Sequence, residues 1–262
     1  MTIILRIARF GLRDLVRSRW LAVYTAFFVF ATWALFRFSD TEQKALLSLA
    51  NVVLFVVPLA TVVFGTIYLY GSREFIQLIL AQPVARQQLY AGVYLGLAVS
   101  MAGAGALGMG SPLILLGRSS ESLAPAITLI VVTAALSAAF TGLAAVIAYL
   151  IEDRVRGLAA ALGAWLALAI VWDAAVLVLA SQFADYPIER GMLAAMIANP
   201  IDLARLLLLF QFDVAALLGY TGAVFQRFLG ASLGVFVAAS ALIAWAVLPA
   251  VLGGRLFYRK DF

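Results

Sequence analysis

The sequence predicts an all-α protein that crosses a membrane six times. Of its 262 residues, 65% are apolar and only 12% are charged. In an ordinary soluble domain about half of the residues are apolar and about a quarter are charged. So few charged side chains could not cover the apolar surface of a water-soluble fold of this length. Six segments approach or exceed the about 20 helical residues that cross a hydrocarbon core. Composition and segment length together exclude a soluble globular domain.

The absent residue types exclude several chemistries. Without histidine or cysteine the chain cannot form an HExxH zinc site, a CxxC redox pair or a Ser-His-Asp triad. The two lysines, Lys44 and Lys260, do not follow a glycine loop of Walker A spacing, so the chain has no such loop for ATP. The net charge of +5 comes from basic residues that flank apolar segments. We therefore expect no binding of nucleic acid.

The first nineteen residues predict an amphipathic helix in the membrane interface. Their arginines recur at helical spacing opposite an apolar face, and such a face directs cations toward lipid phosphates. The alternative is the basic start of a signal peptide, but no small-residue cleavage site follows the next apolar run. The four arginines are Arg6, Arg9, Arg13 and Arg17.

Six apolar segments give the predicted spans. Five contain no charged residue, and the other is interrupted only by Asp173, a single carboxyl that pairing or the nearby interface can accommodate. An even number of spans places both termini on one side of the membrane. The spans are Trp20 to Phe36, Ala45 to Ser72, Gln87 to Gly117, Ser122 to Ile151, Gly157 to about Leu179, and Phe228 to Gly254.

The basic residues orient this arrangement. With both termini inside, 12 of the 18 Lys and Arg residues fall in inner segments and six in outer ones. Because basic residues are enriched on the cytoplasmic side of membrane proteins, both termini are predicted to be cytoplasmic. The whole chain, residues 1–262, forms one transmembrane domain.

Glycines cluster in the third span. Small residues let helices approach closely, which predicts that this span packs deep in the bundle or at a subunit interface. A flexible hinge is the alternative. The glycines are Gly92, Gly96, Gly103, Gly105, Gly108 and Gly110.

Residues 181–227 are interpreted as short helices on the outer surface. Asn199 before Pro200 is typical of a helix start, with Asp202 near the positive end of the helix dipole and Arg205 one turn further on. A cap without any other role is as compatible with these residues as a docking platform for an extracytoplasmic partner. The platform interpretation rests on apolar residues, including 206–210 and 217–220, that exceed the needs of a solvated connection.

Two inner segments carry charges that a cytoplasmic partner could contact. The first, residues 71–86, has a charged start, an amphipathic stretch and a proline stop. It is equally compatible with a short helix on which a cytoplasmic partner pushes and with a simple connection between two spans. The second is the turn 152–156, where two carboxylates could hold Mg²⁺ or transfer protons, although two nearby arginines favour a solvated, self-neutralised turn. The candidate contact residues are Arg73, Glu74, Phe75, Gln77, Glu152 and Asp153.

Asp173 is the remaining candidate. An acidic residue inside a membrane span is by default a candidate functional residue. Asp173, however, lies sixteen residues, or about 24 Å, beyond Gly157 and therefore near the outer interface. The five methionines make no three-ligand copper cluster by spacing, and Met192 and Met196, one turn apart, are better interpreted as core residues.

Together these features resemble the permease subunits of ABC-2 type transporters. The basic first helix, six spans, Arg73-Glu74 segment ending in Pro83-Val84-Ala85-Arg86, and outer helices before the last span cover the whole chain. Val171-Trp172-Asp173 followed by Asn199-Pro200-Ile201-Asp202-Leu203-Ala204-Arg205 is similar to the NosY-type subfamily, which supports copper-site assembly of nitrous oxide reductase. The Arg73-Glu74 segment departs from the more acidic, glycine-containing form of that subfamily.

The resemblance implies a homodimer in the cytoplasmic membrane of a bacterium or archaeon. It also implies separate ABC ATPase subunits, a NosD-like periplasmic partner, contact with membrane lipid, and no cofactor in this chain. The chain would then transmit movement rather than conduct copper. Two alternatives are an ABC-2 exporter of lipid, drug or polysaccharide and an intramembrane enzyme. The enzyme is disfavoured because Asp173 has no second carboxylate in its own span.

Overall fold

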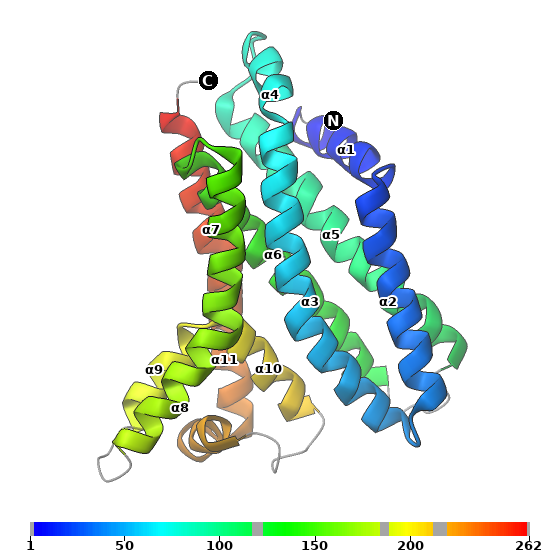
Figure 1. The fold of residues 1–262 in the computed structure, drawn as a ribbon, viewed down its shortest axis with the longest axis vertical. Helices are drawn as coiled ribbons and strands as arrows, with labels where there is room; N and C mark the ends of the chain where they lie inside the picture. The colour runs from blue at the N-terminus through cyan, green and yellow to red at the C-terminus, as the bar shows by residue number, and fades with distance from the viewer. Residues whose placement is uncertain (1–2, 117–122, 184–188, 212–218, 261–262) are drawn as a thin grey trace.

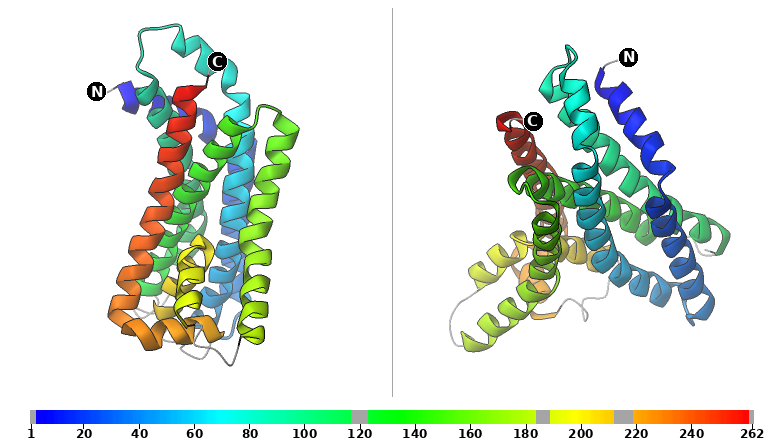
Figure 2. Two further views of the ribbon diagram at one scale, coloured as in Figure 1. Left: turned by 90° about the vertical axis from the view of Figure 1, so that its left-hand side faces the viewer. Right: turned by 45° about the horizontal axis from the view of Figure 1, so that its top comes forward.

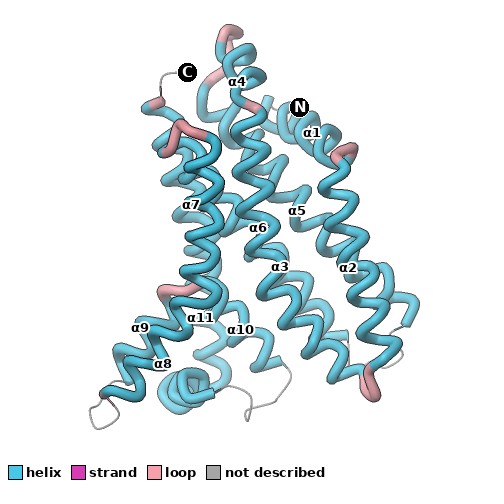
Figure 3. Tube along the Cα trace, in the orientation of Figure 1, coloured by secondary structure: helices cyan, strands magenta, loops and turns pink. Residues whose placement is uncertain are grey.

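The computed structural model describes residues 3–116, 123–183, 189–211 and 219–260. Throughout this part of the chain the architecture is helical, with short connections (Figure 3). The first half contains α1 (Ile3–Val16), α2 (Arg19–Phe38), α3 (Glu42–Gly71), α4 (Arg73–Leu80) and α5 (Arg86–Leu116). The second half contains α6 (Leu123–Leu150), α7 (Arg154–Leu166), a π-helical turn (Ala167–Val171), α8 (Trp172–Gln182), α9 (Glu189–Ile197), α10 (Pro200–Gln211) and α11 (Gly219–Arg259).

Six helical segments in the described residues are long and apolar enough to cross a membrane. They are α2, α3, α5, α6, the continuous run from α7 through α8, and Leu233–Arg259 of α11. The six-span prediction is therefore confirmed, with boundaries close to those expected. A further pair, Gly191–Ile197 with Pro200–Gln211, passes the same test only when counted together and is bent by 98°.

Both termini lie at one end of the bundle, beside α1 and α4 (Figure 1). We call this the terminal end, and the opposite end, which holds α8, α9 and α10, the far end. Of the six spans, α6 is the most deeply buried in the bundle, and the run from α7 to α8 is the least buried. The turned views in Figure 2 show the spans running between the two ends.

The glycines of α5 serve close packing at four of their six positions. A Cβ on Gly92 would overlap Ile7 of α1, and one on Gly108 would overlap Phe28 of α2. A Cβ on Gly105 would likewise overlap Thr133 of α6, and one on Gly96 would come within 3.2 Å of the Ala8 carbonyl, whereas Gly103 and Gly110 have open space. Because α1 and α2 both approach α5 through these glycines, the packing prediction is confirmed.

The first helix packs along α5 with its arginines outward. Ala8, Gly11 and Leu15 are buried, whereas all four predicted arginines are exposed. The amphipathic pattern of residues 3–16 therefore forms the expected helix, and its apolar face covers α5.

The expectation that the apolar residues of α10 lie exposed on a surface is wrong. Its apolar residues are buried against α3, α6 and α11, because the sharp bend after α9 turns α10 back into the bundle (Figure 1). Burial against neighbouring helices accounts for much of the apolar excess from which an exposed platform was inferred. Residues 217–218 lie outside the described residues.

Candidate functional site

The first candidate site is the surface that α4 and the α6–α7 turn form at the terminal end. Arg73, the first residue of α4, donates three hydrogen bonds to backbone carbonyls there. Its Nη1 reaches Glu152 at 2.8 Å, and its Nη2 reaches Ala148 at 3.1 Å and Ile151 at 3.2 Å. The last carbonyls of a helix have no partner within it, and a cation there also complements the helix dipole. Arg73 therefore fixes α4 to the end of the most buried span.

Tyr70 and Lys260 complete this cap. The Tyr70 hydroxyl donates to the Ile151 carbonyl at 2.8 Å, and its ring lies 4.3 Å from the Arg73 guanidinium carbon, a cation–π geometry. The Lys260 ammonium donates to the Tyr149 carbonyl at 3.1 Å. Three different parts of the chain thus converge on the end of α6. Neither Tyr70 nor Lys260 was expected from the sequence.

Gly157 leaves room for the Tyr70 hydroxyl. A Cβ at this position would overlap the hydroxyl oxygen and the ring, so a side chain here would push Tyr70 off the Ile151 carbonyl. The glycine therefore belongs to the cap through the space that it leaves for Tyr70.

The C-terminal end of α11 is held at the same surface. Arg86 donates through Nη1 to the carbonyls of Tyr258 at 3.0 Å and Lys260 at 3.2 Å. Burial lowers the pKa of Lys260; the charge of Arg73 lowers it further, and that of Glu152 raises it. The charges of Arg73 and Glu152 therefore both act on Lys260.

The predicted contact residues divide into exposed and structural ones. Glu74, Gln77 and Glu152 are exposed and free to meet a partner. Phe75 instead stacks on Phe10 of α1, with ring centroids 5.1 Å apart. Asp153 is exposed but caps α7, since its carboxylate accepts a hydrogen bond from the Arg156 amide at 2.7 Å.

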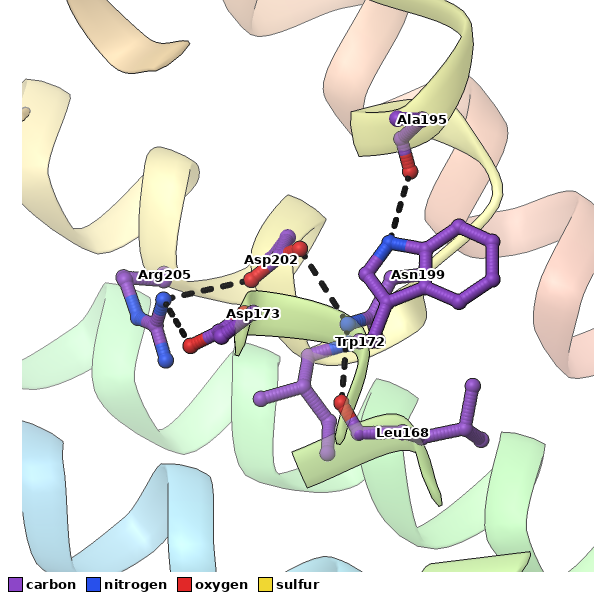
Figure 4. A network of polar contacts seen from close by, with 8 residues as sticks. Leu168, Trp172, Asp173, Ala195, Asn199, Asp202 and Arg205 are labelled. Carbon is purple, nitrogen blue, oxygen red and sulfur yellow. Dashed lines mark hydrogen bonds and ion pairs between the residues drawn. The ribbon is translucent and has the colours of Figure 1, made fainter. Parts of the chain in front are cut away.

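The second candidate site is the break between α9 and α10 (Figure 4). The Asn199 side-chain oxygen accepts a hydrogen bond from the Ile201 amide at 3.0 Å, with Pro200 at the first helical position. The predicted helix start is therefore confirmed. The Asn199 amide group also donates to Asp202 at 3.1 Å and to the Leu168 carbonyl at 2.9 Å.

The π-helical turn makes the Leu168 carbonyl available. In an α-helix the Trp172 amide would bond to Leu168, but here it bonds to Ala167, one residue earlier. Leu168 lies 14 residues after Arg154, or about 21 Å along the helix, so Asn199 reaches it within the depth of a hydrocarbon core of about 30 Å. Such a depth requires every polar backbone group to find a partner.

Two tryptophans supply partners to the last turn of α9. Trp172 donates through Nε1 to the Ala195 carbonyl at 3.2 Å, and Trp245 donates to the Ile197 carbonyl at 3.0 Å. The backbone amides of Ala198 and Asn199, which form the break, donate to the other two carbonyls of that turn, those of Ala194 and Met196. The break is thus a fully hydrogen-bonded helix end and not a frayed one.

Asp173 is paired by Arg205. Nη1 of Arg205 donates to the Asp173 carboxylate at 3.0 Å and to that of Asp202 at 3.2 Å. The contact with Asp202 was expected from helical spacing, but the one with Asp173, which joins α8 to α10, was not. An acid in a span and an arginine in a nearby apolar segment were the only sequence signals for this pair.

Arg205 also lines a cavity of about 500 Å³ with residues of α2 and α3, including Phe27 and Asn51. Within the described residues, no group of three or more acidic side chains could hold a metal ion. Met192 and Met196 are both buried, which confirms that they are core residues. The residues around Arg205 therefore position charged groups and join α8 to α10.

The chain was compared with protein-family models and with characterised proteins. No family model matches the chain. The "Probable ABC transporter permease protein NosY" of Pseudomonas aeruginosa is 27% identical over 286 residues, which cover 99% of each chain. The predicted resemblance to an ABC transporter permease of the NosY type is thereby confirmed over nearly the full length.

Proposed function

We propose that this chain is the membrane-spanning permease subunit of an ABC transporter, driven from the terminal end by a separate ATPase subunit. The observation that carries the proposal is the full-length similarity to an ABC transporter permease. The sequence has no Walker A motif, so ATP hydrolysis is assigned to a partner chain.

The ATPase acts, in this proposal, on α4 and on the α6–α7 turn. Glu74 and Gln77 of α4 and Glu152 of the turn are exposed and offer polar contacts. Arg73 is not itself the contact residue, because its guanidinium is occupied by the carbonyls at the end of α6. A displacement of α4 therefore pulls on the most buried span and carries the movement toward the far end.

The proposed assembly contains two copies of this subunit above two ATPase subunits. The resemblance to ABC-2 permeases supports this stoichiometry. Large apolar side chains on α2, such as Trp20, Phe30 and Trp33, are exposed and offer a face for a second copy or for lipid.

The finer proposal is a NosY-like role in copper-site maturation of nitrous oxide reductase, together with a NosD-like partner at the far end. Its support is the string from Asn199 to Arg205 and the similarity to the relative named NosY. Asn199, Pro200, Asp202 and Arg205 would shape the far end without contacting the partner, since they are engaged within the bundle.

Affinity purification of the tagged full-length chain from its native membrane tests both the general permease proposal and the finer NosY-like proposal. Recovery of an ABC ATPase together with an extracytoplasmic protein supports the NosY-like role. Recovery of the ATPase alone, with export of a lipid, drug or polysaccharide by reconstituted vesicles, supports the alternative exporter. Recovery of no ATPase contradicts the permease proposal itself.

A further inference from the structure

An apolar groove lies between α5 and α11, with α6 as its floor. Its volume is about 810 Å³, within the range of ligand-binding cavities. Seven of its seventeen lining residues are alanines and one is a glycine, so the hollow arises where side chains are small. The larger apolar side chains on its rim are 42–51% exposed, which leaves the groove open to the surroundings: Leu95, Val99, Val247 and Val251.

Two tyrosines hold the groove in shape. The Tyr90 hydroxyl donates to the Ala250 carbonyl at 2.5 Å, and the Tyr94 hydroxyl lies 3.0 Å from the Ala138 carbonyl and 3.3 Å from that of Ala246. These bonds tie α5 to both neighbouring helices. Their rings stack with centroids 6.1 Å apart and line the groove. The hollow is therefore preformed, and the hydroxyls of these two tyrosines are already hydrogen-bonded within the protein.

The groove spans one leaflet and not the whole membrane. Along α5 its lining runs from Gln87 to Ala102, and along α11 from Tyr258 to Ala246, or about 22 and 18 Å at 1.5 Å per residue. One leaflet, headgroups included, is about 20 Å deep. A crossing helix of a second copy would instead need a contact over the full hydrocarbon thickness of about 30 Å.

The mouth of the groove, at the terminal end, is polar and basic. Gln87, Arg255 and Tyr258 line it. Arg255 is exposed and makes no ion pair with any acidic residue in the described part of the chain. A guanidinium is well suited to bind a phosphate through two hydrogen bonds, and tyrosines favour the headgroup level of a bilayer.

We propose that this groove retains one anionic phospholipid of the leaflet at the terminal end, with an acyl chain along the alanines and its phosphate on Arg255. The apolar lining, the one-leaflet length and the unpaired cation at the mouth each fit this occupant. This inference concerns a lipid site and does not depend on the proposed ATPase.

Native mass spectrometry of the full-length chain in mild detergent, supplied with phosphatidylglycerol or phosphatidylcholine, tests the acyl-chain part. Ala246→Leu fills the groove, whereas Ala244→Leu adds the same volume at an exposed position of α11 outside it. We expect retained phosphatidylglycerol to fall at least tenfold in the first variant only. Equal retention in both variants overturns the proposal.

Arg255→Ala tests the headgroup contact, with the exposed Arg259→Ala as its control. We expect about fivefold weaker retention of phosphatidylglycerol, the effect of losing one net hydrogen bond to the phosphate, and recovery in Arg255→Lys. Equal losses in the two alanine variants overturn the headgroup assignment. If Ala246→Leu instead lowers the dimer fraction and leaves the lipid in place, the groove is a contact between copies and the proposal fails.

Discussion

Arg205 binds Asp173 across a gap of 32 residues in the sequence, with 3.0 Å between Nη1 and the carboxylate oxygen. The pair joins α8, just after the π-helical turn, to α10, just after the helix break. Asp202 shares the same nitrogen. Two irregular elements of the far end are therefore held together by one guanidinium.

Replacing Arg205 with Ala is expected to destabilise the far end. Two carboxylates would lose their shared cation, and an unpaired, partly buried polar group costs about 1–3 kcal/mol. The thermal midpoint of the detergent-solubilised protein should fall. Lys44→Ala is the control, because its pair with Asp40 is largely exposed and such pairs contribute about 0–1 kcal/mol. Equal midpoints for Arg205→Ala and Lys44→Ala would contradict this role.

Asn199 is expected to act both as a cap and as a bridge, and two substitutions separate these roles. Asn199→Ser keeps a capping oxygen but is too short to reach the Leu168 carbonyl, whereas Asn199→Ala loses both. Loss of a cap costs about 1 kcal/mol, so the alanine variant should be the less stable of the two. Asn51→Ala is the control, since that amide donates to Leu47 of its own helix. Stability of the serine variant equal to wild type would show that the bridge contributes nothing.

Gly157→Ala is expected to disrupt the cap on α6. The new Cβ would displace Tyr70 from the Ile151 carbonyl, and hydrogen exchange in residues 148–156 should increase. Gly163→Ala on the same helix is the matched control, because its Cβ would meet open space. The same exchange pattern in both variants would argue against the steric role of Gly157.

The orientation is testable because the chain has no cysteine. We expect Gln82→Cys, at the terminal end, to react with an impermeant thiol reagent only after the cells are permeabilised. Ser181→Cys, at the far end, should react in intact cells. Labelling of position 82 in intact cells would reverse the predicted topology.

The spans could be predicted from the sequence because crossing a membrane depends on length and apolarity, which are local properties. Helix α4 was also predictable, from the charged start at Arg73 and the stop at Pro83. The cap of Asn199 followed from the residue order Asn-Pro-x-Asp, since capping involves neighbours within one turn.

The long-range contacts could not be predicted in this way. The pairing of Asp173 with Arg205 depends on the 98° bend between α9 and α10, and no local pattern gives that angle. The π-helical turn at 167–171 lies in a uniformly apolar stretch. Arg73 was expected to be an exposed contact residue because its acceptors are backbone carbonyls 75–79 positions away. Every residue has such a carbonyl, so the sequence does not indicate which of them accept a hydrogen bond.

The central claim is that a separate ATPase engages α4, and the affinity of the cognate ATPase subunit for the Glu74→Lys variant tests it most directly. Glu74 is exposed, so the charge reversal should leave the bundle folded. Asp40→Lys provides the same reversal at the opposite end. We predict at least tenfold weaker ATPase binding for Glu74→Lys and unchanged binding for Asp40→Lys. Wild-type affinity in the Glu74→Lys variant would contradict the account.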